Sequence, residues 1–139
     1  MNAEVGLWID HKKTVIVNGQ GNEIVTLESN LEENPRLTSG HGKTPFGAKV
    51  FLTDNHLDRR FMERLNRYYM DVIAKLRDAR SIVIMGPGEA KFELEKRLQH
   101  AGLKENVVAI ETADKLTDRQ IAARVKKYFA SLKLSIRNS

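Results

Sequence analysis

Residues 66–98 read NRYYMDVIAKLRDARSIVIMGPGEAKFELEKRL. The first part continues a series of apolar residues at steps of three and four, which predicts an amphipathic helix over residues 55–78. SIVIM at 81–85 is a short, continuous apolar run, typical of a strand covered on both faces. The Gly-Pro-Gly that follows predicts a turn into a second helix at 89–100. A helix, a buried strand and a helix in direct succession indicate an α/β fold.

The first thirty residues predict a three-stranded antiparallel meander. Polar and apolar residues alternate over 4–10 and over 23–28, and 14–17 is β-branched throughout. Asn-Gly-Gln-Gly-Asn at 18–22 favours a hairpin turn, because Asn and Gly tolerate the positive φ that such turns need. This segment therefore supplies three strands before the long helix begins.

The C-terminal third supplies a last strand and a last helix. NVVAI at 106–110 predicts the strand, and Thr117 is expected to cap the helix. The predicted order is β-β-β-α-β-α-β-α, which gives a mixed five-stranded sheet with helices on its faces. The chain has 139 residues, so we expect one domain over residues 1–132, with 133–139 as a fraying tail.

A long loop is predicted at residues 30–48, which hold two of the three prolines. Loops of this length are usually functional or disordered. KVFLT at 49–53 fits either a short strand or the beginning of the long helix. SGHGKT at 39–44 looks like the end of a phosphate-binding P-loop, but Leu37 stands where that motif needs glycine and no helix start follows. We therefore exclude nucleotide hydrolysis at this motif.

The composition removes several classes of site. The chain has no cysteine, which excludes disulfides, Cys-ligated zinc, iron–sulfur clusters and a thiol nucleophile. Its four histidines show no metal-ligand spacing, so neither a metal nor a cofactor is predicted. No apolar run approaches the roughly 18 residues of a membrane span, and the start lacks an export signal. We expect a cytoplasmic protein with no membrane partner.

The charge is unevenly distributed along the chain. Residues 1–35 carry 2 basic and 6 acidic side chains, whereas residues 36–139 carry 21 and 12. A basic body is compatible with a polyanion partner on one face. An ordinary solvated surface explains the same numbers, so the charge alone does not decide between them.

One basic row is predicted on the long helix. Arg60, Arg64 and Arg67 stand at i, i+4 and i+7, so they share a helix face. They suit phosphate contacts on RNA, because guanidinium forks match phosphate oxygens. They also suit surface pairing with Glu63 and Asp71, and both interpretations stay open.

The Gly-Pro-Gly turn has two interpretations. Unpaired N–H groups at the start of the following helix could bind an anion, with Gly86, Gly88 and Lys91 as its contacts. Alternatively, the glycines and proline only make a tight turn, and the spacing favours this structural role.

Asp10 stands at the end of the first strand, where nucleases of the ribonuclease H type begin their metal-binding carboxylate cluster. The sequence has Met85-Gly86-Pro87 where the fourth strand of such a nuclease would supply a second carboxylate. A metal nuclease is therefore not supported, and Asp10 is expected to be a turn residue.

Residues 66–98 and the order of elements resemble the middle domain of archaeal and eukaryotic class I peptide-release factors. They resemble more closely the bacterial relatives of those factors and of Pelota. The resemblance implies a ribonuclease H-like fold of the translational-machinery type. Release factors carry Gly-Gly-Gln in the loop before the long helix, and this chain has no Gly-Gly-Gln. Pelota also lacks it, so the resemblance implies ribosome or tRNA contact without peptidyl-tRNA hydrolysis.

Our leading hypothesis is a non-catalytic, translation-associated protein that binds ribosomal RNA or tRNA through a basic face. The expected RNA contacts are His41, Lys43, Lys49, Arg60, Arg64 and Arg67. One alternative is a protein-interaction module with no nucleic-acid role. The other is a hydrolase in which Asp10 and His41 act as a pair, which requires them to lie within reach of each other. We assign no catalytic residue and no nucleotide cofactor, and the oligomeric state stays open.

Overall fold

The computed structural model describes residues 3–31 and 47–138, with side chains described for 3–31 and 59–134. The elements, in chain order, are β1 (Glu4–Ile9), β2 (Lys13–Asn18), β3 (Ile24–Glu28), α2 (Gly47–Leu76), β4 (Ser81–Gly86), α3 (Ala90–His100), a short 3-10 helix η1 (Lys104–Asn106), β5 (Val107–Thr112) and α4 (Asp118–Asn138). The predicted order of strands and helices is confirmed. None of the helices in these described residues is long and apolar enough to cross a membrane.

The five strands form one mixed sheet in the order β3-β2-β1-β4-β5. β1 pairs antiparallel with β2, and β2 antiparallel with β3, as expected for a meander with short connections. β4 pairs in parallel with both β1 and β5. These parallel pairs need crossover connections, which α2 and α3 provide.

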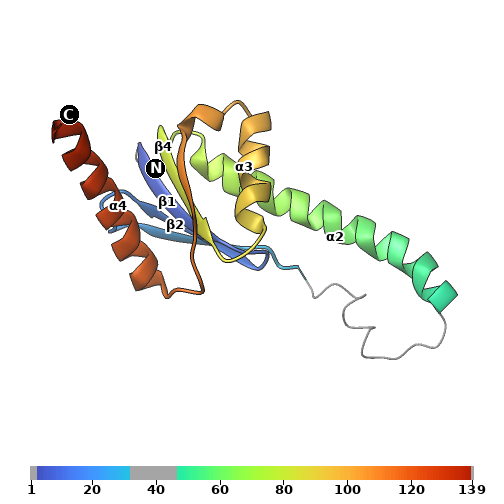
Figure 1. Cartoon of the computed structure of the whole chain (residues 1–139). Helices are drawn as coiled ribbons and strands as arrows, with labels where there is room; N and C mark the ends of the chain where they lie inside the picture. The colour runs from blue at the N-terminus through green and yellow to red at the C-terminus, as the bar shows by residue number, and fades with distance from the viewer. Residues whose placement is uncertain (1–2, 32–46, 139) are drawn as a thin grey trace.

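Helices cover both faces of the sheet, with α2 and α3 on one face and α4 on the other (Figure 1). Successive strand residues point to opposite faces, so each strand contributes to two apolar clusters. The cluster under α2 and α3 includes Leu7, Ile9, Ile16, Ile82 and Ile84 from the strands. The cluster under α4 includes Trp8, Val15, Val17, Val83 and Met85. SIVIM is thus buried on both faces, as its sequence predicts.

The two long helices extend beyond their predicted bounds. α2 begins at Gly47 rather than at residue 55, so KVFLT at 49–53 is the beginning of the helix and not a strand. α4 continues to Asn138 through the stretch that was expected to fray. Its predicted cap is present, because Gln120 N donates to Thr117 Oγ1 at 3.1 Å. Thr117 N donates in return to Gln120 Oε1 at 2.9 Å, which makes the cap reciprocal.

Candidate functional site

The arginine row predicted on α2 is present as an exposed surface. Arg60, Arg64 and Arg67 are all exposed. Arg64 and Arg67 also line a hollow of about 340 Å³ between α2 and the end of β3; its other lining residues are Glu28, Ser29, Asn30, Tyr68 and Asp71. Arg64 and Arg67 therefore lie on the flank of α2 that faces β3, with the carboxylates of Glu28 and Asp71 beside them.

The remaining predicted RNA contacts are not all described. His41 and Lys43 lie outside the described residues. Lys49 lies in the first turn of α2, but its side chain also lies outside the described part. Of the six expected contacts, the structure thus describes the side chains of Arg60, Arg64 and Arg67 as exposed on α2. RNA contact by all six residues stays a prediction.

Asp10 is a turn residue, as its sequence context predicts. Its Oδ1 accepts hydrogen bonds from Lys12 N and Lys13 N, both at 2.8 Å. Its own N–H donates to Lys13 O at 3.0 Å and closes the β1–β2 connection. Because one carboxylate oxygen holds two backbone donors, the side chain stabilises the hairpin. Among the described residues, no group of three or more His, Asp and Glu side chains is placed to hold a metal ion.

A buried lysine in the first turn of α3 contacts the Gly-Pro-Gly turn. Lys91 is only 3% exposed, and its Nζ donates to Gly88 O at 2.6 Å. The same ammonium lies 4.6 Å from the ring centroid of Phe92. At Gly86, a Cβ atom would overlap the carbonyl oxygen of Ile9, so the turn needs glycine for close backbone approach. These contacts support the structural role of the turn, and anion binding there stays a prediction.

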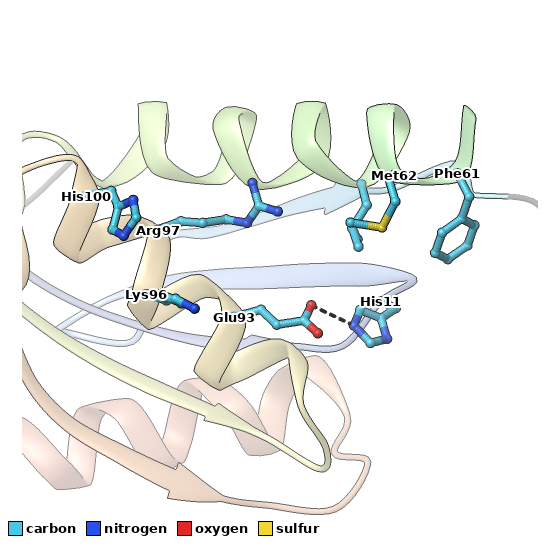
Figure 2. A pocket seen from close by; sticks show the side chains of 8 residues that line it. His11, Phe61, Met62, Glu93, Lys96, Arg97 and His100 are labelled. Atoms are coloured by element: carbon cyan, nitrogen blue, oxygen red, sulfur yellow. Dashed lines mark hydrogen bonds and ion pairs between the residues drawn. The ribbon is translucent and has the colours of Figure 1, made fainter. Parts of the chain in front are cut away.

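A cleft of about 580 Å³ lies between α2 and α3 (Figure 2). Apolar side chains of α2 form one wall; these are Phe61, Met62 and Leu65. The polar lining residues come from α3 and from the β1–β2 connection, and they are His11, Glu93, Lys96, Arg97 and His100. Residues distant in the sequence thus form a concave site that no local pattern predicted.

A buried polar network supports this cleft. Tyr69 is fully buried, and its hydroxyl donates to Glu93 Oε1 at 2.5 Å. The same oxygen lies 3.0 Å from His11 Nε2. Burial, and next the hydrogen bond to Glu93, raise the pKa of Tyr69, so the phenol remains a donor. The Arg97 guanidinium lies 4.6 Å from the centroid of the Tyr69 ring and donates to Asn66 Oδ1 at 2.6 Å.

The adjacent tyrosine anchors α2 to the strands. Tyr68 OH donates to Asp10 O at 2.9 Å, and the Thr14 hydroxyl lies 2.6 Å from it as its second partner. Burial raises the pKa of Tyr68 as well, with a smaller contribution from the charge of Asp10. Both tyrosines lie on the buried face of α2. A buried tyrosine hydroxyl needs a hydrogen-bond partner, so the sequence could indicate that each has one. The neighbouring residues in the sequence do not show which residue that partner is.

One of three comparisons with known proteins found matches, and it concerns the fold. No protein-family model matches the chain, and no curated protein matches it. Among solved structures, Pelota of Archaeoglobus fulgidus matches 94% of this chain with a TM-score of 0.51 and 17% identity. This chain has the fold of part of Pelota. It covers 34% of that protein, and so spans about a third of its length.

Two further structures are similar at lower scores. Pelota of Thermoplasma acidophilum matches 98% of this chain at 16% identity, with 42% of its own length covered and a TM-score of 0.49. The archaeal translation termination factor aRF1 matches 96% at 12% identity, with 41% of its length covered and a TM-score of 0.42. The strand order shows the expected mixed five-stranded sheet of an α/β fold.

Proposed function

We propose that this chain is a non-catalytic, translation-associated protein that binds ribosomal RNA or tRNA through the arginine row of α2. The observation that carries the proposal is the exposure of Arg60, Arg64 and Arg67 on one helix of a fold shared with part of Pelota. The excess of basic residues after residue 35 supports the same partner class.

The geometry of the row suits a nucleic-acid backbone. At 1.5 Å of rise per residue, Arg60 and Arg67 stand about 10 Å apart along the helix axis. Successive phosphates of a helical strand advance by about 3.4 Å along its axis, so the row spans about three nucleotides. Each guanidinium can donate two parallel hydrogen bonds to one phosphate. Asp71 and Glu28 border the row and limit the length of backbone that it can hold.

Hydrolysis of peptidyl-tRNA is not part of the proposal. The sequence has no Gly-Gly-Gln, and one oxygen of the Asp10 carboxylate holds the β1–β2 connection. The role proposed is contact with RNA in the manner of a binding protein, with a bacterial cytoplasmic ribosome as the partner.

The proposal is tested by the salt dependence of tRNA binding, measured by fluorescence anisotropy. A variant with Arg60, Arg64 and Arg67 all changed to alanine is expected to make the negative slope of log K against log salt less steep by about two to three units, because three phosphates are no longer neutralised. The matched control changes three exposed basic residues of α4, on the opposite face of the sheet, to alanine: Arg119, Arg124 and Lys127. Equal slopes for the two triple variants would contradict the assignment of the RNA face to α2.

One observation favours the alternative of a protein-interaction module. Met62 is 46% exposed and Met70 is 66% exposed along the flank of α2 that faces α3. If the chain is such a module, it will bind neither tRNA nor ribosomes, even at low salt. The arginine proposal predicts salt-sensitive binding of both, weakened when Arg60, Arg64 and Arg67 are alanine.

A further inference from the structure

The cleft between α2 and α3 has a separate role in our interpretation. We infer that it binds one unpaired nucleotide, with the base against the apolar wall and the 5′-phosphate at the cationic end. The inference rests on the proposed function, because a bound RNA strand is the expected source of that nucleotide. The cleft itself lies on the flank of α2 opposite the arginine row.

The size and the apolar wall suit a base. The volume of about 580 Å³ lies within the range of about 300–1,000 Å³ typical of small-ligand sites. Phe61 is half-buried and Met62 is 46% exposed, so both offer apolar surface to a ligand. Bases stack on aromatic rings without regard to sequence, and a thioether adapts its shape to a planar group.

The opposite end of the cleft is cationic. Lys96, Arg97 and His100 come from α3, and Figure 2 shows Arg97 extending from α3 into the space beside α2. A neighbouring hollow of about 350 Å³ shares Arg97 and His100 and adds Arg77. A phosphate at this end would therefore meet several cations at once.

Arg97 is held in position before any ligand binds. The ring of Tyr69 supports its guanidinium, and Asn66 Oδ1 accepts one of its hydrogen bonds. A guanidinium has five N–H donors, so others remain to bind a phosphate. Because the side chain is already ordered, binding loses less conformational entropy than it would with a mobile arginine.

Among the described residues that line the cleft, Glu93 is the one carboxylate. Glu93 projects toward His11, on the side of the cleft where Figure 2 shows Met62 and Phe61. Its Oε1 is occupied by Tyr69 OH and His11 Nε2. Its position beside the apolar wall suits an exocyclic amino group of a base, which donates to a carboxylate. The phosphate is thus expected beside Arg97 and His100, toward the end of the cleft away from His11.

A single RNA strand can reach both flanks of α2. Arg64 and Arg67 line the flank that faces β3, whereas Met62 and Leu65 line the flank that faces α3. A helix with its side chains is about 10–12 Å across, so the strand has only this width to cross. This short path favours an RNA nucleotide over an unrelated acidic ligand.

The test is nuclear magnetic resonance of the ¹⁵N-labelled full chain, titrated separately with adenosine monophosphate and with a hexaadenylate RNA. Both ligands are expected to shift the amides of the cleft residues. The Lys96→Glu variant is expected to bind each ligand about tenfold more weakly, because it places a like charge beside the phosphate. Lys104→Glu is the matched control, because Lys104 is also an exposed lysine but lies in η1, outside the lining of the cleft.

The outcomes separate the two proposals. If neither ligand shifts the cleft amides, or if Lys96→Glu and Lys104→Glu bind alike, the nucleotide site is refuted. If the mononucleotide shifts the cleft but hexaadenylate does not, RNA is refuted as the source. Neither result affects the proposed function, which fails only if tRNA and ribosome binding do not depend on the arginine row.

Discussion

Two buried tyrosines make the stability of this protein sensitive to alkaline pH. Tyr68 and Tyr69 are 3% and 0% exposed, and burial raises the pKa of both above that of a tyrosine in the unfolded chain. The native state therefore holds these protons more tightly than the unfolded state does. The resulting stability is fully present below about pH 10 and is lost as the pH rises further.

The size of the loss follows from the ionisation of the unfolded chain. An unfolded tyrosine has a pKa of about 10, so at about pH 11 its ionisation favours unfolding by about 1.4 kcal/mol while the native phenol stays protonated. Two such tyrosines give about 3 kcal/mol. That loss is a large part of the about 5–15 kcal/mol that stabilises a typical domain.

Urea denaturation followed by circular dichroism measures this loss directly, as the difference in the free energy of unfolding between about pH 8 and about pH 11. The Tyr69→Phe variant is expected to reduce that difference by about 1.4 kcal/mol, whatever its stability at the lower pH. Tyr128→Phe is the control, because Tyr128 is only partly buried and its pKa is raised less. If the Tyr69→Phe variant loses as much unfolding free energy between about pH 8 and about pH 11 as the unmodified chain does, the buried network does not hold the phenol neutral.

Two further substitutions test the turns around the sheet. Gly86→Ala is expected to destabilise the fold by about 3 kcal/mol or more, because its Cβ would overlap the Ile9 carbonyl. Gly88→Ala has open space around its Cβ and should change the stability by less than about 1 kcal/mol. Thermal unfolding compares the two variants, and equal losses of stability would contradict the close approach of the Gly86 and Ile9 backbones. Asp10→Ala removes the acceptor of the Lys12 and Lys13 amides and should cost about 2 kcal/mol in urea denaturation. An unchanged midpoint for Asp10→Ala would show that the carboxylate does not hold the turn.

The element order was predictable because it depends on local patterns. The alternation in the meander, the apolar run of β4 and the steps of three and four in α2 each lie within one segment. The beginning of α2 was not predictable, since KVFLT is rich in residues that suit a strand as well as a helix. The exposure of Arg60, Arg64 and Arg67 follows from helix periodicity and was therefore predictable too.

The cleft depends on contacts between distant segments, which local patterns do not determine. His11 and Glu93 stand 82 residues apart in the chain, yet their side chains lie 3.0 Å apart. Lys91 is a second example, because its sequence position allowed an anion contact, whereas its side chain is buried and its Nζ donates to Gly88 O. In both cases the packing of α3 on the sheet decides the environment of the side chain.

Co-sedimentation with ribosomes tests the central claim most directly. The purified chain is pelleted with ribosomes at about 50 mM and about 200 mM salt, beside the variant in which Arg60, Arg64 and Arg67 are alanine. The account predicts saturable pelleting at low salt that weakens at high salt and is largely lost in the arginine variant. A chain that stays in the supernatant at low salt, or a variant that pellets like the unmodified chain, would contradict it.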